Sequence, residues 1–168
     1  MTRNIVQTVL FATLLLGVAA VASAQGNIRG GVCTNATVMG RWGTTMTGTL
    51  IPSTGAVPFA AVNYATYDGV GNYSGTQTRS NNGTVSRVTF QGTYTVNPDC
   101  TGKKTTKGYD QSGNLLNTVE QDFVIVNSGK EIVEIFTSLT LPNGTGVPAV
   151  VTGHSIKMFP IDWPSWTW

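Results

Sequence analysis

The chain has 168 residues, of which only 11% are Asp, Glu, Lys or Arg, and its formal net charge at pH 7 is +2. This near-neutral balance gives no electrostatic reason to expect nucleic acid or anionic lipid as a partner. Twenty-six Thr and 20 Gly stand where an ordinary soluble protein carries Lys and Glu. Because the branched Thr side chain suits the exposed face of a sheet, the composition favours an all-β protein with a hydroxyl-rich surface.

The amino terminus has the pattern of an export signal. Arg3 is followed by an apolar run over residues 5–22, and Ala22-Ser23-Ala24 provides the small residues of a cleavage site. Polar residues interrupt the run, which favours a cleaved signal over a transmembrane anchor. We therefore predict a signal peptide at 1–24 and a secreted or periplasmic mature chain.

Short strands separated by turn signals follow one another along the rest of the chain. Dipeptides such as Asn82-Gly83 and Asn143-Gly144 occur at near-regular intervals between Thr- and Val-rich runs. Eight strands in succession predict an eight-stranded antiparallel up-and-down barrel, because closure removes the exposed sheet edges. A two-sheet β-sandwich is the alternative. The expected strands are 37–50, 57–67, 72–79, 84–97, 105–110, 115–126, 131–139 and 149–159.

These strands define one domain at 37–159, preceded by a flexible lead-in at 25–36. The strand at 84–97 shows the clearest alternation of apolar and polar residues. Its two expected faces are Val88, Phe90, Tyr94 and Val96 on one side, and Thr89, Gln91, Thr93 and Thr95 on the other.

Cys33 and Cys100 are the only cysteines. In an oxidising compartment a lone pair is most simply a disulfide. The bond would tie the segment before the first strand to the turn at residues 98–102. Two free thiols or half of a metal site are the alternatives, and the chain has no further Cys and only one His to complete such a site.

Two segments carry a resemblance to known families. Gly40-Arg41-Trp42 resembles the Gly-x-Trp that opens the barrel of lipocalins and, in variant form, of avidins. The segment from Gly92 to Gly102 resembles one found in small exported bacterial proteins of the allene oxide cyclase barrel-like or calycin-like kind. The resemblance implies an eight-stranded barrel whose interior holds a small apolar molecule. The chain departs from lipocalins in lacking a Thr-Asp-Tyr-type motif and in carrying Lys157 where they have Arg, and no catalytic residue of the cyclases maps onto it.

The candidate residues for a cavity or a barrel end are mostly aromatic. Trp42 is suited to closing the barrel base, with ligand stacking as the alternative role. The remaining candidates are Phe90 and Tyr94 from the fourth strand, Tyr64 or Tyr67 from the second, and His154 from the eighth.

Catalytic groups are scarce. His154 is the only histidine, and Ser155 beside it points to the opposite face of a strand, so the two cannot form a nucleophile–base pair. Glu120 and Asp122 share one face of the sixth strand, where we expect a solvated outer surface rather than a glycosidase pair. We predict no catalytic residues, no metal site and no cofactor.

The tail at 160–168 holds three of the four tryptophans and two prolines. It either folds back onto the barrel or forms an exposed surface for a partner. The leading hypothesis is a non-catalytic barrel that binds a small apolar ligand or has a structural role. The alternatives are an enzyme of the cyclase or isomerase type, which would need a buried carboxylate or His154 facing a cavity, and a small outer-membrane barrel, which the prolines in the tail disfavour.

Overall fold

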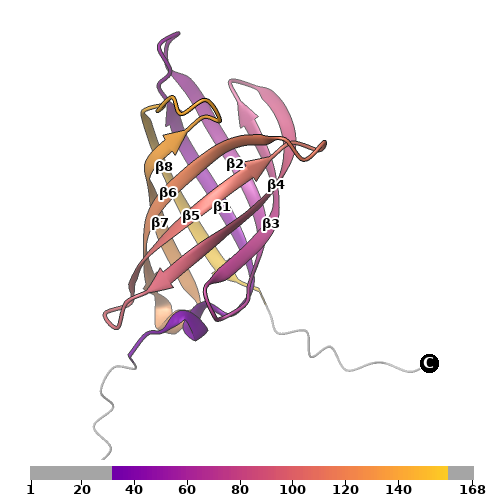
Figure 1. Cartoon of the computed structure of the whole chain (residues 1–168). Helices are drawn as coiled ribbons and strands as arrows, with labels where there is room; N and C mark the ends of the chain where they lie inside the picture. Colours follow the sequence, from indigo (N-terminus) through magenta and orange to yellow (C-terminus); the bar gives the residue numbers. More distant parts are fainter. Residues whose placement is uncertain (1–31, 159–168) are drawn as a thin grey trace, which may run out of the picture. The chain divides into compact units, whose positions relative to one another are not determined.

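The structure is a computed structural model that describes residues 32–158. Within that range the chain forms a closed barrel of eight strands, and strands adjacent in sequence are adjacent in the sheet (Figure 1). Two single-turn 3-10 helices, η1 (Asn35–Val38) and η2 (Asn127–Gly129), accompany them. The strands are β1 (Gly40–Leu50), β2 (Val57–Tyr67), β3 (Asn72–Asn81), β4 (Thr84–Val96), β5 (Thr101–Tyr109), β6 (Leu115–Val126), β7 (Glu131–Thr140) and β8 (Ala149–Lys157).

The barrel closes because β1 pairs with both β2 and β8, and every pairing is antiparallel. The predicted up-and-down barrel is therefore confirmed and the sandwich alternative is excluded. The expected bounds of β2 and β6 match the observed ones. The first strand starts later than expected, because η1 takes up Asn35–Val38, and β5 starts earlier, at Thr101.

Side chains alternate across the wall as the sequence predicts. In β4, Val88, Phe90 and Tyr94 are buried inside the barrel, whereas Thr89 and Gln91 are exposed outside it. The exposed faces are rich in Thr, as the composition suggests. Successive side chains of a strand point to opposite faces of the sheet. The register of pairing therefore determines which side chains of each strand face the barrel interior.

One end of the barrel is closed by Trp42, which is fully buried. Its indole Nε1 donates a hydrogen bond of 2.8 Å to the Val38 carbonyl of η1. The Lys157 ammonium lies 5.5 Å from the centre of the Trp42 ring and donates to the Thr37 carbonyl. A cation over an indole face is a favourable contact, so Trp42 fixes η1 and the end of β8 together at this end.

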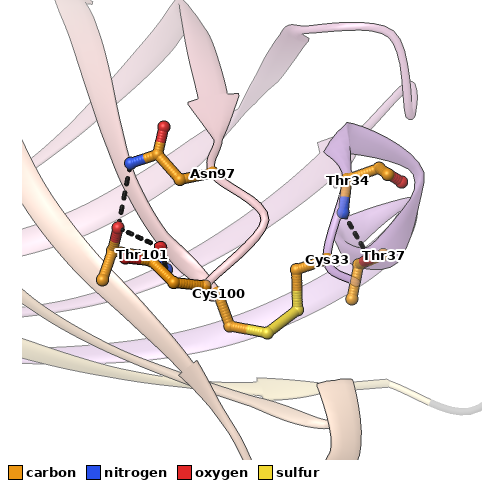
Figure 2. The surroundings of a disulfide bond; sticks show 7 residues. Cys33, Thr34, Thr37, Asn97, Cys100 and Thr101 are labelled. Carbon is orange, nitrogen blue, oxygen red and sulfur yellow. Dashed lines mark hydrogen bonds between the residues drawn. A yellow bond between two sulfur atoms is a disulfide. The ribbon is translucent and has the colours of Figure 1, made fainter. Parts of the chain in front are cut away.

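The disulfide between Cys33 and Cys100 is present, as predicted, with the two Cα atoms 5.0 Å apart (Figure 2). It links the segment before η1 to the turn between β4 and β5. The Cys33 amide also donates to the Pro98 carbonyl at 3.3 Å. Because the cysteines are 67 residues apart, the cross-link stabilises the fold by about 4 kcal/mol in the chain-entropy model.

Three glycines inside strands make room for aromatic rings. A Cβ added at Gly75 would lie 2.6 Å from Phe90 Cζ, and one at Gly92 would lie 2.8 Å from Tyr73 Cε1. At Gly102 the corresponding distance, to Phe123 Cζ, is 2.2 Å. These glycines let large rings approach the backbone of the wall closely, which helps a narrow barrel accommodate its aromatics.

Several sequence predictions lie outside the described residues. These are the signal peptide at 1–24, the part of the lead-in before residue 32, and the tail at 160–168. Within residues 32–158, no helix is both long enough and apolar enough to cross a membrane.

Candidate functional site

The barrel interior contains a cavity of about 360 Å³. It extends from the middle of the barrel to the end opposite η1, where Pro52, Leu141 and Val147 from the connecting loops contribute to its mouth. Ligand pockets in proteins have volumes of roughly 300–1,000 Å³, so the space suffices for a small organic molecule.

Most of the cavity wall is apolar. Met46 of β1, Phe59 of β2 and Phe136 of β7 line it, and Met46 and Phe59 also belong to a buried cluster with Val151 of β8. Phe59 and Phe136 have ring centres 6.3 Å apart. Val88 and Phe90 line the side of the cavity formed by β4. This lining favours an occupant that is itself largely hydrocarbon.

Below the cavity, toward the closed end, four aromatic rings pack together. Tyr67 stacks on Tyr73 with centres 4.9 Å apart and an interplanar angle of 11°. Tyr67 also meets Trp42 edge-on at 6.2 Å and Tyr94 edge-on at 5.1 Å. The Tyr94 hydroxyl accepts a hydrogen bond from the Gly69 amide and donates to the Asn35 carbonyl. These contacts make a rigid floor rather than a second opening.

A buried ion pair lies directly above this floor. The Lys104 ammonium of β5 pairs with the Glu134 carboxylate of β7, and their side chains are only 6% and 1% exposed. Lys104 also donates to the Tyr67 hydroxyl at 3.3 Å and lies 5.7 Å from the centre of the Tyr73 ring. Buried charges are tolerated only when they are paired and hydrogen-bonded. Lys104 meets both conditions, whereas Glu134 is paired with Lys104 and its buried Oε2 atom has no other partner.

Other polar groups near the floor bond to one another. The Tyr73 hydroxyl is hydrogen-bonded to Thr106, whose hydroxyl bonds to the buried Gln121 at 2.8 Å. Thr44 and Ser155 share a hydrogen bond of 2.7 Å on the opposite wall. Tyr73, Thr106 and Gln121, like Thr44 and Ser155, thus satisfy one another by hydrogen bonds.

Burial also perturbs the tyrosines of the floor. Loss of solvation raises the pKa of Tyr67 well above 10.0, and the nearby Glu134 and Tyr94 raise it further. Burial likewise raises the pKa of Tyr73 and, to a smaller extent, that of Tyr94. These phenols consequently remain neutral hydrogen-bonding groups at physiological pH.

A second polar region lies nearer the mouth, on β2 and β3. Arg79, Asn81 and Asn63 all line the cavity. Arg79 Nε donates to the Ser86 hydroxyl at 3.2 Å. The side-chain Oδ1 atoms of Asn63 and Asn81 are buried and lack a hydrogen-bond partner. This region therefore has unused hydrogen-bonding capacity.

The structure divides the predicted site residues into three groups. Tyr67 and Phe90 line the cavity, and Trp42 and Tyr94 lie in the closed end beneath it. Tyr64 is 40% exposed on the outer wall, because it is three residues from the inward-facing Tyr67 and so has the opposite orientation. Whether the first two groups bind a ligand stays a prediction.

His154 also faces outward, so the expectation that it belongs to the cavity is corrected. It shares the outer face of β8 with Ile156, and Met158 just beyond the strand is exposed as well. Its ring Nε2 lies 2.9 Å from the Glu131 carboxylate. The amide of Asn127, together with His154, lowers the pKa of Glu131.

The sequence prediction missed the charged groups of the interior. Lys104 lies between Lys103 and Thr105 in a strand with weak alternation, which gave no reason to place it inside. Glu134 offered a signal, since it shares parity with Ile132 in a strand whose other face is also aliphatic. By contrast, Glu120 and Asp122 are exposed on the outer face, as expected.

Residues 32–158 hold no group of three or more His, Cys, Asp or Glu side chains arranged to bind a metal ion. In the part of the chain that the structure describes, the chemistry-bearing groups of the cavity are thus the Lys104–Glu134 pair, the tyrosines and the polar region around Arg79.

No protein-family model matches the chain, and neither does any curated protein. What the residues and the structure establish is a disulfide-linked, eight-stranded, all-antiparallel closed β-barrel, consistent with a calycin-like fold and with an oxidising compartment.

Proposed function

We propose that the protein is exported to the periplasm or secreted, and that its barrel binds one small, mostly apolar molecule. The cavity of about 360 Å³ with apolar walls carries this proposal. The signal pattern at 1–24 and the disulfide support export. The lipocalin-like resemblance of Gly40-Arg41-Trp42 supports the same use of the interior.

The outer surface supports an aqueous rather than a lipid environment. Lys103 and Lys107 of β5 and Glu120 and Asp122 of β6 are all exposed on the outside of the barrel. A barrel embedded in a bilayer carries an apolar band at these positions, where charged side chains are costly. This argues for a binding protein in solution over an outer-membrane barrel.

Thermal unfolding with a series of straight-chain acids and alcohols of increasing length tests the proposal. Each methylene buried should strengthen binding by about 0.8 kcal/mol until the cavity is full, so stabilisation should rise with length and then level off. If none of the compounds stabilised the protein, ligand binding would be contradicted. A structural role would then be the remaining explanation.

Two blocking variants locate the binding. Val88→Trp fills the cavity from β4, and Leu116→Trp narrows it near the mouth. Thr89→Trp is the matched control, because Thr89 is exposed on the outer face beside Val88. The first two should abolish the ligand-induced stabilisation and the third should keep it. If Val88→Trp does not fold, Leu116→Trp, which is half-buried at the mouth, still decides the question.

A proton-transfer enzyme of the isomerase type is the second candidate, favoured by one observation. Glu134 is a buried carboxylate that lines the cavity beside Lys104 and the Tyr67 hydroxyl. Carboxylate, ammonium and phenol groups are those that move protons to and from bound substrates. A bound ketone incubated in D₂O would exchange its α-hydrogens if Glu134 acts as a base, and Glu134→Gln would stop the exchange. If the α-hydrogens exchanged only at the uncatalysed rate, the enzyme hypothesis would be contradicted and ligand binding would remain as the function.

A further inference from the structure

The charges inside the cavity do not balance. Lys104 is neutralised by Glu134, with which it forms an ion pair. Arg79 lines the same cavity, and no carboxylate of residues 32–158 lies within ion-pair distance of it. One positive charge of the cavity is thus left without an opposite charge.

Arg79 is half-buried, and most of its N–H donors have no hydrogen-bond partner among the described residues. A guanidinium has five N–H donors, and a single side-chain hydrogen bond, from Nε to Ser86, is formed by Arg79 in the described residues. Burial lowers its pKa, because the cation has lost part of its hydration. A half-buried cation without a counter-charge is unfavourable by itself, and an anion placed beside it would relieve that cost.

Its neighbours also lack partners. Asn81 follows two residues later on the same inner face of β3, and Asn63 lies on the inner face of β2. Their Oδ1 atoms are buried and unbonded, and the Asn63 amide nitrogen contacts only the Met46 sulfur, at 3.3 Å. Side-chain amides can present either their NH₂ or their oxygen toward a ligand. Arg79 is therefore the charged donor of this region, and a rotated Asn81 amide would turn its NH₂ group toward the same small oxygen-rich ligand.

Building on the proposed function, we infer that the ligand is an apolar monocarboxylic acid, bound as its carboxylate at Arg79. A planar carboxylate matches the guanidinium fork with two parallel hydrogen bonds. Its single negative charge equals the one unbalanced charge of the cavity. The hydrocarbon body then lies against Met46, Phe59 and Phe136, which line the cavity. An ammonium ligand would add a second unpaired cation beside Arg79 and is disfavoured.

Binding of decanoic acid and of decan-1-ol at pH 7, followed by titration calorimetry, tests this inference. The two probes share a chain length and differ in charge. Arg79→Gln removes the cation from the cavity, and Arg87→Gln is the matched control, since Arg87 is exposed on the outer face of β4, next to β3. Arg79→Lys keeps the charge but loses the fork.

We expect Arg79→Gln to weaken decanoate binding about tenfold, as a charge-assisted pair predicts, and to leave decanol binding unchanged. Arg79→Lys should lose less, and Arg87→Gln should change neither affinity. Equal decanoate affinity in wild type, Arg79→Gln and Arg87→Gln would overturn the inference but leave the proposed function standing. Failure of both probes to bind the wild-type protein would overturn the proposed function itself. Should Arg79→Gln not fold, tighter wild-type binding of decanol than of decanoate would overturn the inference alone.

Discussion

The buried pair of Lys104 and Glu134 makes the strongest energetic prediction. Both side chains are almost fully enclosed, so removing one partner leaves the other charge buried and uncompensated. Lys104→Met or Glu134→Met should therefore each lower the free energy of unfolding by about 3–5 kcal/mol. The double variant replaces both charges by apolar groups, and it should lie within about 2 kcal/mol of wild type or exceed it.

A matched exposed pair on neighbouring positions provides the control. Lys103 and Asp122 lie 4.0 Å apart on the outer face of β5 and β6, with side chains 78% and 52% exposed. A double-mutant cycle with Lys103→Met and Asp122→Leu should give a coupling energy below about 1 kcal/mol. The cycle inside the barrel should give about 3 kcal/mol or more.

Urea denaturation at pH 7, followed by tryptophan fluorescence, measures all of these variants. The slope of the free energy against urea should stay constant, so that midpoint shifts report stability. A coupling energy for the inner pair as small as that of the outer pair would refute the reasoning. It would mean that water reaches Lys104 and Glu134 and that the cavity has no dry floor.

Three further predictions concern the frame of the barrel. Replacing Cys33 and Cys100 by Ser should lower the free energy of unfolding by about 4 kcal/mol. Thermal unfolding with and without reductant measures this loss, and an unchanged melting temperature would contradict the stabilising role of the disulfide. Gly92→Ala should destabilise the barrel and disturb the packing of the floor, because the added Cβ would lie 2.0 Å from the Thr105 carbonyl oxygen. Near-ultraviolet circular dichroism should show weaker aromatic signals. Wild-type spectra and stability in this variant would contradict the prediction. The Asn72 side chain and nearby backbone amides lower the pKa of Asp68 from 3.8 to about 2, so its stabilising contribution is complete above pH 3.8 and is lost as the pH falls toward 2. Asp68→Asn should flatten the dependence of stability on pH in that window, and an unaltered slope would show that other groups cause it.

Turn chemistry and strand alternation sufficed to predict the frame of the barrel. Asn82-Gly83 adopts positive φ at both residues, as the tight hairpin turn between β3 and β4 requires. Phe90 and Tyr94 have the inward orientation that their spacing indicates. Local signals work here because each strand is joined to the next by a short connection, so the order in sequence is also the order in space.

The charged interior could not be predicted in the same way. Lys104 on β5 and Glu134 on β7 meet across the intervening β6, near Gln121, which pairs with Lys104. Their approach depends on the register of two separate pairings and on an irregularity between Glu120 and Gln121 in the pairing of β6 with β7. No local pattern encodes such a distance. A Lys or Glu in a strand is ordinarily expected outside, because isolated charges are costly to bury.

For Arg79, the orientation could be predicted from the sequence but the missing counter-charge could not. Its inward orientation follows from its parity with Tyr73, which is buried six residues earlier on β3. Arg79 is a candidate ligand-binding residue because it has no carboxylate partner among the described residues. The absence of a partner can be established only once the positions of all eight strands are known.

Chemical-shift mapping of the ¹⁵N-labelled protein during titration with decanoate tests the central claim most directly. If the barrel holds the acid in its interior, the perturbed amides should cluster on cavity-lining positions such as Arg79, Phe90 and Phe136. Outward positions such as Thr89 and His154 should move little. Perturbations confined to the outer wall, or none at saturating decanoate, would contradict it.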